Sequence, residues 1–229
     1  MRKLLAFVSV FLLLNTSFGQ DVGATFLQTP SSFTTTCPNP TQSIDVVISN
    51  FDAVSDFNIS ANHIRVTVNI TGASTQTITQ DVESGTILPG GNFLVPFSTT
   101  CDLSVVGTHV FTCSTSLLTG GPDVDPTNDT DSPVSVRVEV PTITLLSPGE
   151  NIQSLCQNTS INSIVYFIGG GATNAVTAGL PLGLSELYDP SDSTFTISGS
   201  PSEFSSFPYT ITTSGGCTPD VGLSGTIDV

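Results

Sequence analysis

The sequence predicts an all-β protein of two tandem β-sandwich domains. Apolar and polar residues alternate over many short runs, which is the period of half-buried strands. No run shows the 3.6-residue stripe of an amphipathic helix. Turns rich in Gly, Pro and Asn separate the runs at regular spacing, as in a sandwich.

The first half supplies several strands in chain order. Apolar residues alternate with polar ones in each run, and a "LPGG" turn precedes the third of the runs 44–48, 64–70, 93–97 and 134–140. In the second half, "PTITLLSPG" begins a strand at Pro141, and "SIVYFIGGG" is apolar on both faces, which predicts a central strand. The runs 194–198 and 207–211 restore the alternation around a Gly-Ser-Pro turn.

The first twenty residues have the pattern of a cleaved signal peptide. Basic Arg2 and Lys3 precede the apolar run 4–14 and a small-x-small site at 17–19. The chain has 4 Lys+Arg and 19 Asp+Glu, so losing the two basic residues leaves 2 − 19 = −17. Such a surface repels nucleic acid and anionic lipid. No later stretch is apolar for the roughly 18 residues of a membrane span, so we expect a secreted or outer-surface protein.

The length remaining after residue 20 favours two domains. We place them at 21–140 and 141–229, because the valine-rich strand ends at Val140 and a new strand follows Pro141 at once. Almost no linker remains, and proline restricts the joint. An end-to-end, fairly rigid rod is the expected arrangement.

Particular motifs resemble known families. Residues 22–140 are similar to a CARDB-type Ig-like module in "VVISNF", "LPGG", "CDLSVVGTHVFT" and "DPTNDT". Residues 141–229 resemble the Ig-like or cadherin-like repeats of large bacterial surface adhesins in "AGLPLGLS", "TISGSP", "PYTITTSGGC" and "SGTIDV". The resemblance implies spacer and adhesive units within a longer surface protein, with neighbouring repeats of the same chain and an extracellular protein or glycan as partners.

The sequence offers little for catalysis. Only His63 and His109 are present, and Ser and Asp are too common for their spacing to indicate a triad. We interpret His109 as replacing the corner tyrosine of Ig-like folds, where an imidazole makes the same backbone hydrogen bond. The "GGG" at 169–171 is followed by no helix pattern, which favours a turn over a phosphate cradle. We therefore expect no enzyme and no cofactor.

The acidic stretch "GPDVDPTNDTD" is the candidate metal site. Calcium takes six to eight oxygen ligands, which a turn-rich loop can gather. The alternative is a hairpin of Asx turns, favoured by the lack of EF-hand spacing. The candidate ligands are Asp123, Asp125, Asn128, Asp129 and Asp131.

Five cysteines in an exported chain suggest disulfides. Cys156 and Cys217 are the two of the second module, so we pair them. In the first module Cys37 precedes the run 44–48, which corresponds to strand B of an Ig-like fold, and Cys101 precedes the strand that contains His109, which corresponds to strand F. The connections that lead into these two strands lie at one end of a sandwich, which predicts a Cys37–Cys101 bond. Cys113 shares a strand face with His109, and we expect a buried free thiol.

The predicted function is that of a non-catalytic spacer and contact region of a secreted or cell-surface adhesin. The alternative is an accessory region, with carbohydrate binding through polar loops, of a secreted enzyme whose catalytic domain lies downstream. The absence of Trp speaks against an aromatic sugar platform.

Overall fold

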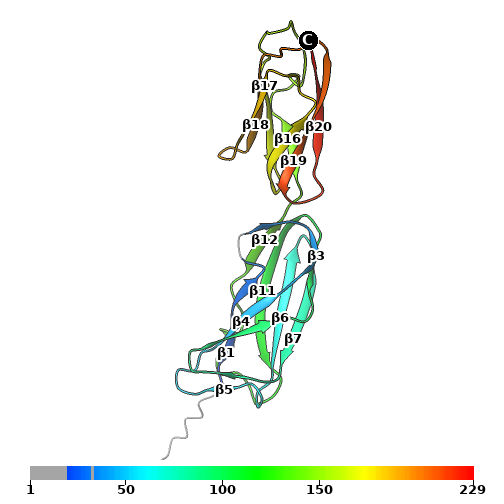
Figure 1. The fold of residues 1–229 in the computed structure, drawn as a ribbon. Coiled ribbons are helices and arrows are strands. Elements are labelled where there is room, and N and C mark those ends of the chain that lie inside the picture. The colour runs from blue at the N-terminus through cyan, green and yellow to red at the C-terminus, as the bar shows by residue number, and fades with distance from the viewer. Residues whose placement is uncertain (1–19, 32–33) are drawn as a thin grey trace, which may run out of the picture.

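The computed structural model describes residues 20–31 and 34–229, and every regular element among them is a β-strand. Two β-sandwiches of the immunoglobulin-like type lie end to end (Figure 1). The predicted fold class is therefore confirmed. The predicted signal peptide lies outside the described residues except for Gln20.

The first sandwich packs a five-stranded sheet, in the order β2-β12-β11-β6-β7, against the sheet β1-β4-β9 and the pair β10-β3, with a small β5-β8 pair at its edge. Its strands are β1 (Val22–Thr29), β2 (Thr35–Thr36), β3 (Asn39–Gln42), β4 (Asp45–Asn50), β5 (Phe57–Asn58), β6 (Ile64–Gly72), β7 (Gln76–Val82), β8 (Thr86–Ile87), β9 (Asn92–Pro96), β10 (Cys101–Leu103), β11 (Gly107–Leu117) and β12 (Val134–Val138).

Strand β6 illustrates how the alternation builds this sandwich. Its four aliphatic residues are fully buried, while Arg65 and Asn69 between them face solvent. The antiparallel register with β11 places Val68 opposite Cys113 and Ile70 opposite Phe111, so both strands direct one apolar face inward. These residues belong to a hydrophobic core to which both sheets contribute side chains. A one-residue slip would expose the whole set, which fixes the register.

The second sandwich packs the sheet β13-β15-β18-β17 against the sheet β14-β20-β19-β16. Its strands are β13 (Thr142–Leu145), β14 (Ile152–Ser154), β15 (Ile164–Gly169), β16 (Ala172–Ala178), β17 (Leu184–Asp189), β18 (Thr194–Gly199), β19 (Ser206–Gly216) and β20 (Gly222–Asp228).

The core of the second sandwich is separate from the first and is built around two tyrosines. Tyr166 on β15 and Tyr209 on β19 are buried, and their hydroxyls lie 2.9 Å apart. Each hydroxyl thus finds a hydrogen-bond partner from the opposite sheet, which offsets the cost of burying it. As predicted, β15 is an interior strand, between β13 and β18.

Candidate functional site

The joint between the sandwiches is short. Strand β12 ends at Val138 and β13 begins at Thr142, so residues 139–141 alone connect them. Where the connection leaves the first sandwich, the Nε of Arg137 lies 2.5 Å from the Oε1 of Glu139. The Glu139 N–H also donates to the carbonyl of Thr36, which ties the start of the connection to β2. The connection therefore has little freedom of its own.

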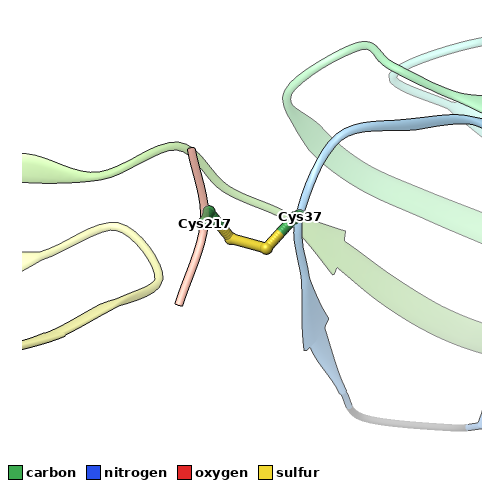
Figure 2. Close-up of a disulfide and its surroundings, with 2 residues drawn as sticks. All are labelled: Cys37 and Cys217. Carbon is green, nitrogen blue, oxygen red and sulfur yellow. A yellow bond between two sulfur atoms is a disulfide. The ribbon is translucent and has the colours of Figure 1, made fainter. Parts of the chain in front are cut away.

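A disulfide crosses this joint (Figure 2). It joins Cys37, between β2 and β3 of the first sandwich, to Cys217, directly after β19 of the second, across 180 residues of sequence. The two domains are thus connected twice, once by the backbone at 139–141 and once by sulfur. This second link restricts rotation about the short connection.

The pairing corrects the predicted Cys156–Cys217 bond. Strand β19 runs the length of the second sandwich, from Ser206 at the far end to Gly216 at the joint (Figure 1). Cys156 follows β14, whose Ser154 pairs with Asp228 at the far end. Cys156 and Cys217 therefore lie at opposite ends of the domain, and Cys156 is an exposed free thiol.

The predicted Cys37–Cys101 bond is also wrong. The two connections do come together, since β3 pairs with β10, but the register aligns Cys101 with Gln42 and Leu103 with Asn39. Cys37 lies beyond Asn39, at the end of this pair, while the side chain of Cys101 is buried in the core. Register within the sheet, which the loop argument did not consider, separates the two sulfurs.

The two other cysteines of the first sandwich are buried free thiols. Burial raises the pKa of Cys101 to about 11 and that of Cys113 to about 12. The thiolate is the reactive form, so both side chains behave as small apolar core residues at neutral pH.

The triple glycine at 169–171 forms the β15–β16 turn at the joint. Gly170 has φ +62°, and a Cβ there would lie 1.9 Å from the carbonyl oxygen of Val140. Gly171 has φ +85°, and its Cβ would lie 2.8 Å from the Sγ of Cys217. These glycines allow the turn to approach both the connecting segment and the disulfide closely.

Two hollows flank Arg137 beside the joint. The larger, about 500 Å³ and here called the apolar hollow, lies between the domains and is lined by Val106, Gly107, Arg137, Val138, Glu139, Val140, Thr142, Phe167, Gly169 and Gly170. The smaller, about 210 Å³ and here called the hydroxyl hollow, lies on the first sandwich and is lined by Thr34, Thr35, Thr108, Ser135 and Arg137. Sequence reasoning missed both, because their residues meet only through β-sheet register and domain packing.

The candidate calcium residues hold the acidic loop to the sandwich. The Asp123 carboxylate accepts a hydrogen bond from the Val22 N–H at 3.0 Å. Asn128 donates to Asp21 at 2.6 Å, and Asp129 accepts from the Thr115 hydroxyl at 3.1 Å. Asp125 closes an Asx turn by accepting from the Thr127 N–H, and Asp131 accepts from the N–H of the next residue, Ser132.

The electrostatics of this loop reflect the same arrangement. Burial and the neighbouring carboxylates raise the pKa of Asp129, and burial raises that of Asp131. Hydrogen bonds from Thr127 lower the pKa of Asp125. Over residues 20–31 and 34–229, no three His, Cys, Asp or Glu side chains are grouped so that they could hold a metal ion. The calcium site therefore stays a prediction, and these contacts favour the hairpin of Asx turns.

His109 has a structural position. It is fully buried, with Nε2 2.8 Å from the Val105 carbonyl and Nδ1 3.1 Å from the Ser74 hydroxyl. The carbonyl can only accept, so Nε2 carries the proton and Nδ1 accepts from Ser74. The ring thereby returns a hydrogen bond to the backbone four residues upstream, the role of a corner tyrosine. His63 is partly exposed, and its main-chain N–H, not its ring, donates to the Thr119 hydroxyl.

No family model matches the chain, and no curated protein matches its sequence. Several solved structures resemble it at low identity. A CARDB domain from Pyrococcus furiosus, solved in complex with di-metal ions, is 14% identical over 53% of this chain and 90% of its own, with a TM-score of 0.36. Domains 4 and 5 of the S-layer protein SbsC are 16% identical over 57% and 69%, with a TM-score of 0.31.

Titin A168169 spans more of the molecule, covering 90% of this chain and 98% of its own at 10% identity and a TM-score of 0.33. Scores this low carry no conclusion about function. The assignment to the class of tandem Ig-like β-sandwich proteins rests on the strands and sheets described above. In the described part of the chain, no helix has the length and hydropathy needed to cross a membrane.

Proposed function

We propose that the chain is a covalently locked, two-domain spacer of a secreted or cell-surface protein, and that it holds a contact surface at a fixed distance and angle. The observation that carries this proposal is the Cys37–Cys217 bond across the joint. A flexible tether needs no such bond, whereas a stalk that transmits position or force gains from a second covalent link. The domain division at 21–140 and 141–229 is part of the proposal.

Other features support an extracellular setting. Disulfides persist in oxidising compartments. Without the two basic residues of the signal peptide the formal net charge is 2 − 19 = −17, which favours solubility outside the cell. The outer strand faces carry hydroxyl and amide side chains, such as Thr67, Asn69 and Thr79 on β6 and β7. An adhesive role, within a longer protein of related repeats, belongs to the same proposal.

The alternative is an accessory region of a secreted enzyme. The observation that favours this alternative is the pair of hollows beside Arg137. An accessory region directs a catalytic domain to its substrate by binding that substrate, and a hollow is where such a ligand binds. Sequencing the reading frame beyond Val229 separates the two: further repeats support the spacer, and a hydrolase domain supports the accessory role.

Small-angle X-ray scattering tests the locked joint. The expected result for the oxidised protein is one rigid, elongated particle whose profile fits the end-to-end arrangement. A Cys37→Ser, Cys217→Ser variant should show a broader distribution of domain orientations. If the oxidised protein and the variant give the same broad distribution, the bond does not lock the joint and the proposal is wrong.

A further inference from the structure

We infer that the two hollows beside Arg137 together form a binding site for a neutral saccharide. This inference rests on the proposed locked joint, because the apolar hollow takes its walls from both sandwiches. Its volume, about 500 Å³, lies in the usual range of small-ligand sites.

An exposed aromatic ring and two valines supply the apolar part of the site. Phe167 is 40% exposed, and Val106 and Val140 are 51% and 36% exposed at the same hollow. A Cβ on Gly169 would lie 2.7 Å from the Phe167 ring, so the glycine gives this ring its room. A sugar presents C–H groups on the faces of its ring, and an exposed aromatic face is the surface on which they pack.

The hydroxyl hollow supplies the polar part. Thr108 on β11 lies directly opposite Arg137 on β12, which is in turn paired with Thr35 on β2. Residues aligned in this way share one face of the sheet, and Ser135 lies on the same face two residues before Arg137. Each hydroxyl can both donate and accept hydrogen bonds, as sugar hydroxyls do.

The charge of the site favours an uncharged ligand. Glu139 neutralises Arg137, and the protein as a whole is strongly negative. A polyanion would be repelled at long range and would compete with Glu139 at short range. The ion pair nevertheless stays accessible, since the Arg137 side chain is 68% exposed. It presents guanidinium donors and a carboxylate acceptor side by side, which matches a pair of neighbouring sugar hydroxyls.

A peptide fits this site less well. Peptides that add to a sheet need free main-chain groups at a strand edge. Here the Arg137 N–H already donates to the Thr34 carbonyl, and the Glu139 N–H to that of Thr36. Recognition is left to side-chain hydroxyls, one ion pair and an aromatic face.

Saturation-transfer NMR and calorimetry with cellotetraose, mannotetraose and chitotetraose test the inference, with trigalacturonate as the charged comparison. At least one neutral tetrasaccharide should bind at millimolar concentration, more tightly than trigalacturonate. Phe167→Ala on one sandwich and Thr108→Val on the other should each weaken binding, the former about ten-fold. Arg65→Gln is the matched control: it removes the exposed Arg65–Asp81 ion pair elsewhere on the first sandwich and should leave affinity unchanged.

Each other outcome overturns the inference. Absence of binding to all three tetrasaccharides refutes the saccharide site, and tighter trigalacturonate binding refutes the neutral assignment. If neither Phe167→Ala nor Thr108→Val weakens binding, the ligand binds elsewhere. If an apolar tetrapeptide gives a saturation-transfer signal and the sugars do not, the site binds a peptide. Scattering from the same samples reports the joint independently, so a failed saccharide site and a failed locked joint are distinguishable.

Discussion

Removing the interdomain bond should destabilise whichever sandwich unfolds first. When the second sandwich unfolds on an intact first one, the chain from Pro141 to Cys217 remains closed into a loop of about 77 residues, anchored by the backbone at one end and by Cys37 at the other. In the chain-entropy model, closing such a loop costs the unfolded state about 4.5 kcal/mol. The Cys37→Ser, Cys217→Ser variant releases that constraint.

The constraint acts on both domains. If the first sandwich unfolds instead, the loop runs from Cys37 to Pro141, about 105 residues, and the entropy term is about the same because it grows only with the logarithm of length. The double variant should therefore lower the free energy of unfolding of the less stable domain by up to about 5 kcal/mol. Engineered bonds deliver less than this when strain opposes them, so the figure is an upper value.

Differential scanning calorimetry and urea denaturation measure the effect. Far-UV circular dichroism follows both domains, and tyrosine fluorescence follows the second sandwich alone, because Tyr166, Tyr188 and Tyr209 all lie there. Cys156→Ser is the matched control, because Cys156 is an exposed free thiol at the far end of the second sandwich. It should leave both transitions in place. Unchanged transitions in the double variant would refute the loop-closure reasoning, and an equal loss in the Cys156→Ser control would show that the effect is not specific to the joint.

Three further predictions concern the cores and the acidic loop. His109→Phe should lower the free energy of unfolding, measured in urea, by about 1 kcal/mol, because the part-buried hydrogen bond from the ring to the Val105 carbonyl is lost; an unchanged midpoint would contradict the corner role. The pKa of Asp129 is raised in the folded state, so the ionised carboxylate destabilises the fold. The free energy of unfolding is therefore highest at low pH, where Asp129 is protonated, and it falls as the pH rises through the folded-state pKa. Asp129→Asn should therefore melt higher than wild type at pH 7 and at the same temperature near pH 3; a lower Tm at pH 7 would argue against it. Tyr209→Phe should lower the free energy of unfolding by about 1–2 kcal/mol, because it leaves the Tyr166 hydroxyl unpaired. The Tyr166→Phe, Tyr209→Phe double variant should be nearly as stable as wild type; if it is destabilised as much as the single variant, the two hydroxyls are not coupled.

The local features of the fold were predictable because they depend on residue order. The alternation along β6 predicts which of its side chains face the core, because a sheet that buries one face must bury the four apolar side chains of this strand together. The interior position of β15 followed from apolar residues on both faces. The corner position of His109 followed from its spacing after Gly107 and from the hydrogen-bonding capacity of imidazole.

The features on which the proposed function rests depended on distances between residues far apart in the chain. The predicted disulfides assumed that each domain satisfies its own cysteines, but the length of β19 separates Cys156 from Cys217 and the β3–β10 register separates Cys37 from Cys101. The hollows beside Arg137 join strand neighbours with a ring from the other domain. Sequence alone determined which faces are buried, since that follows from local periodicity. Tertiary structure decided which loops meet at the joint, because register, strand length and domain packing set those distances.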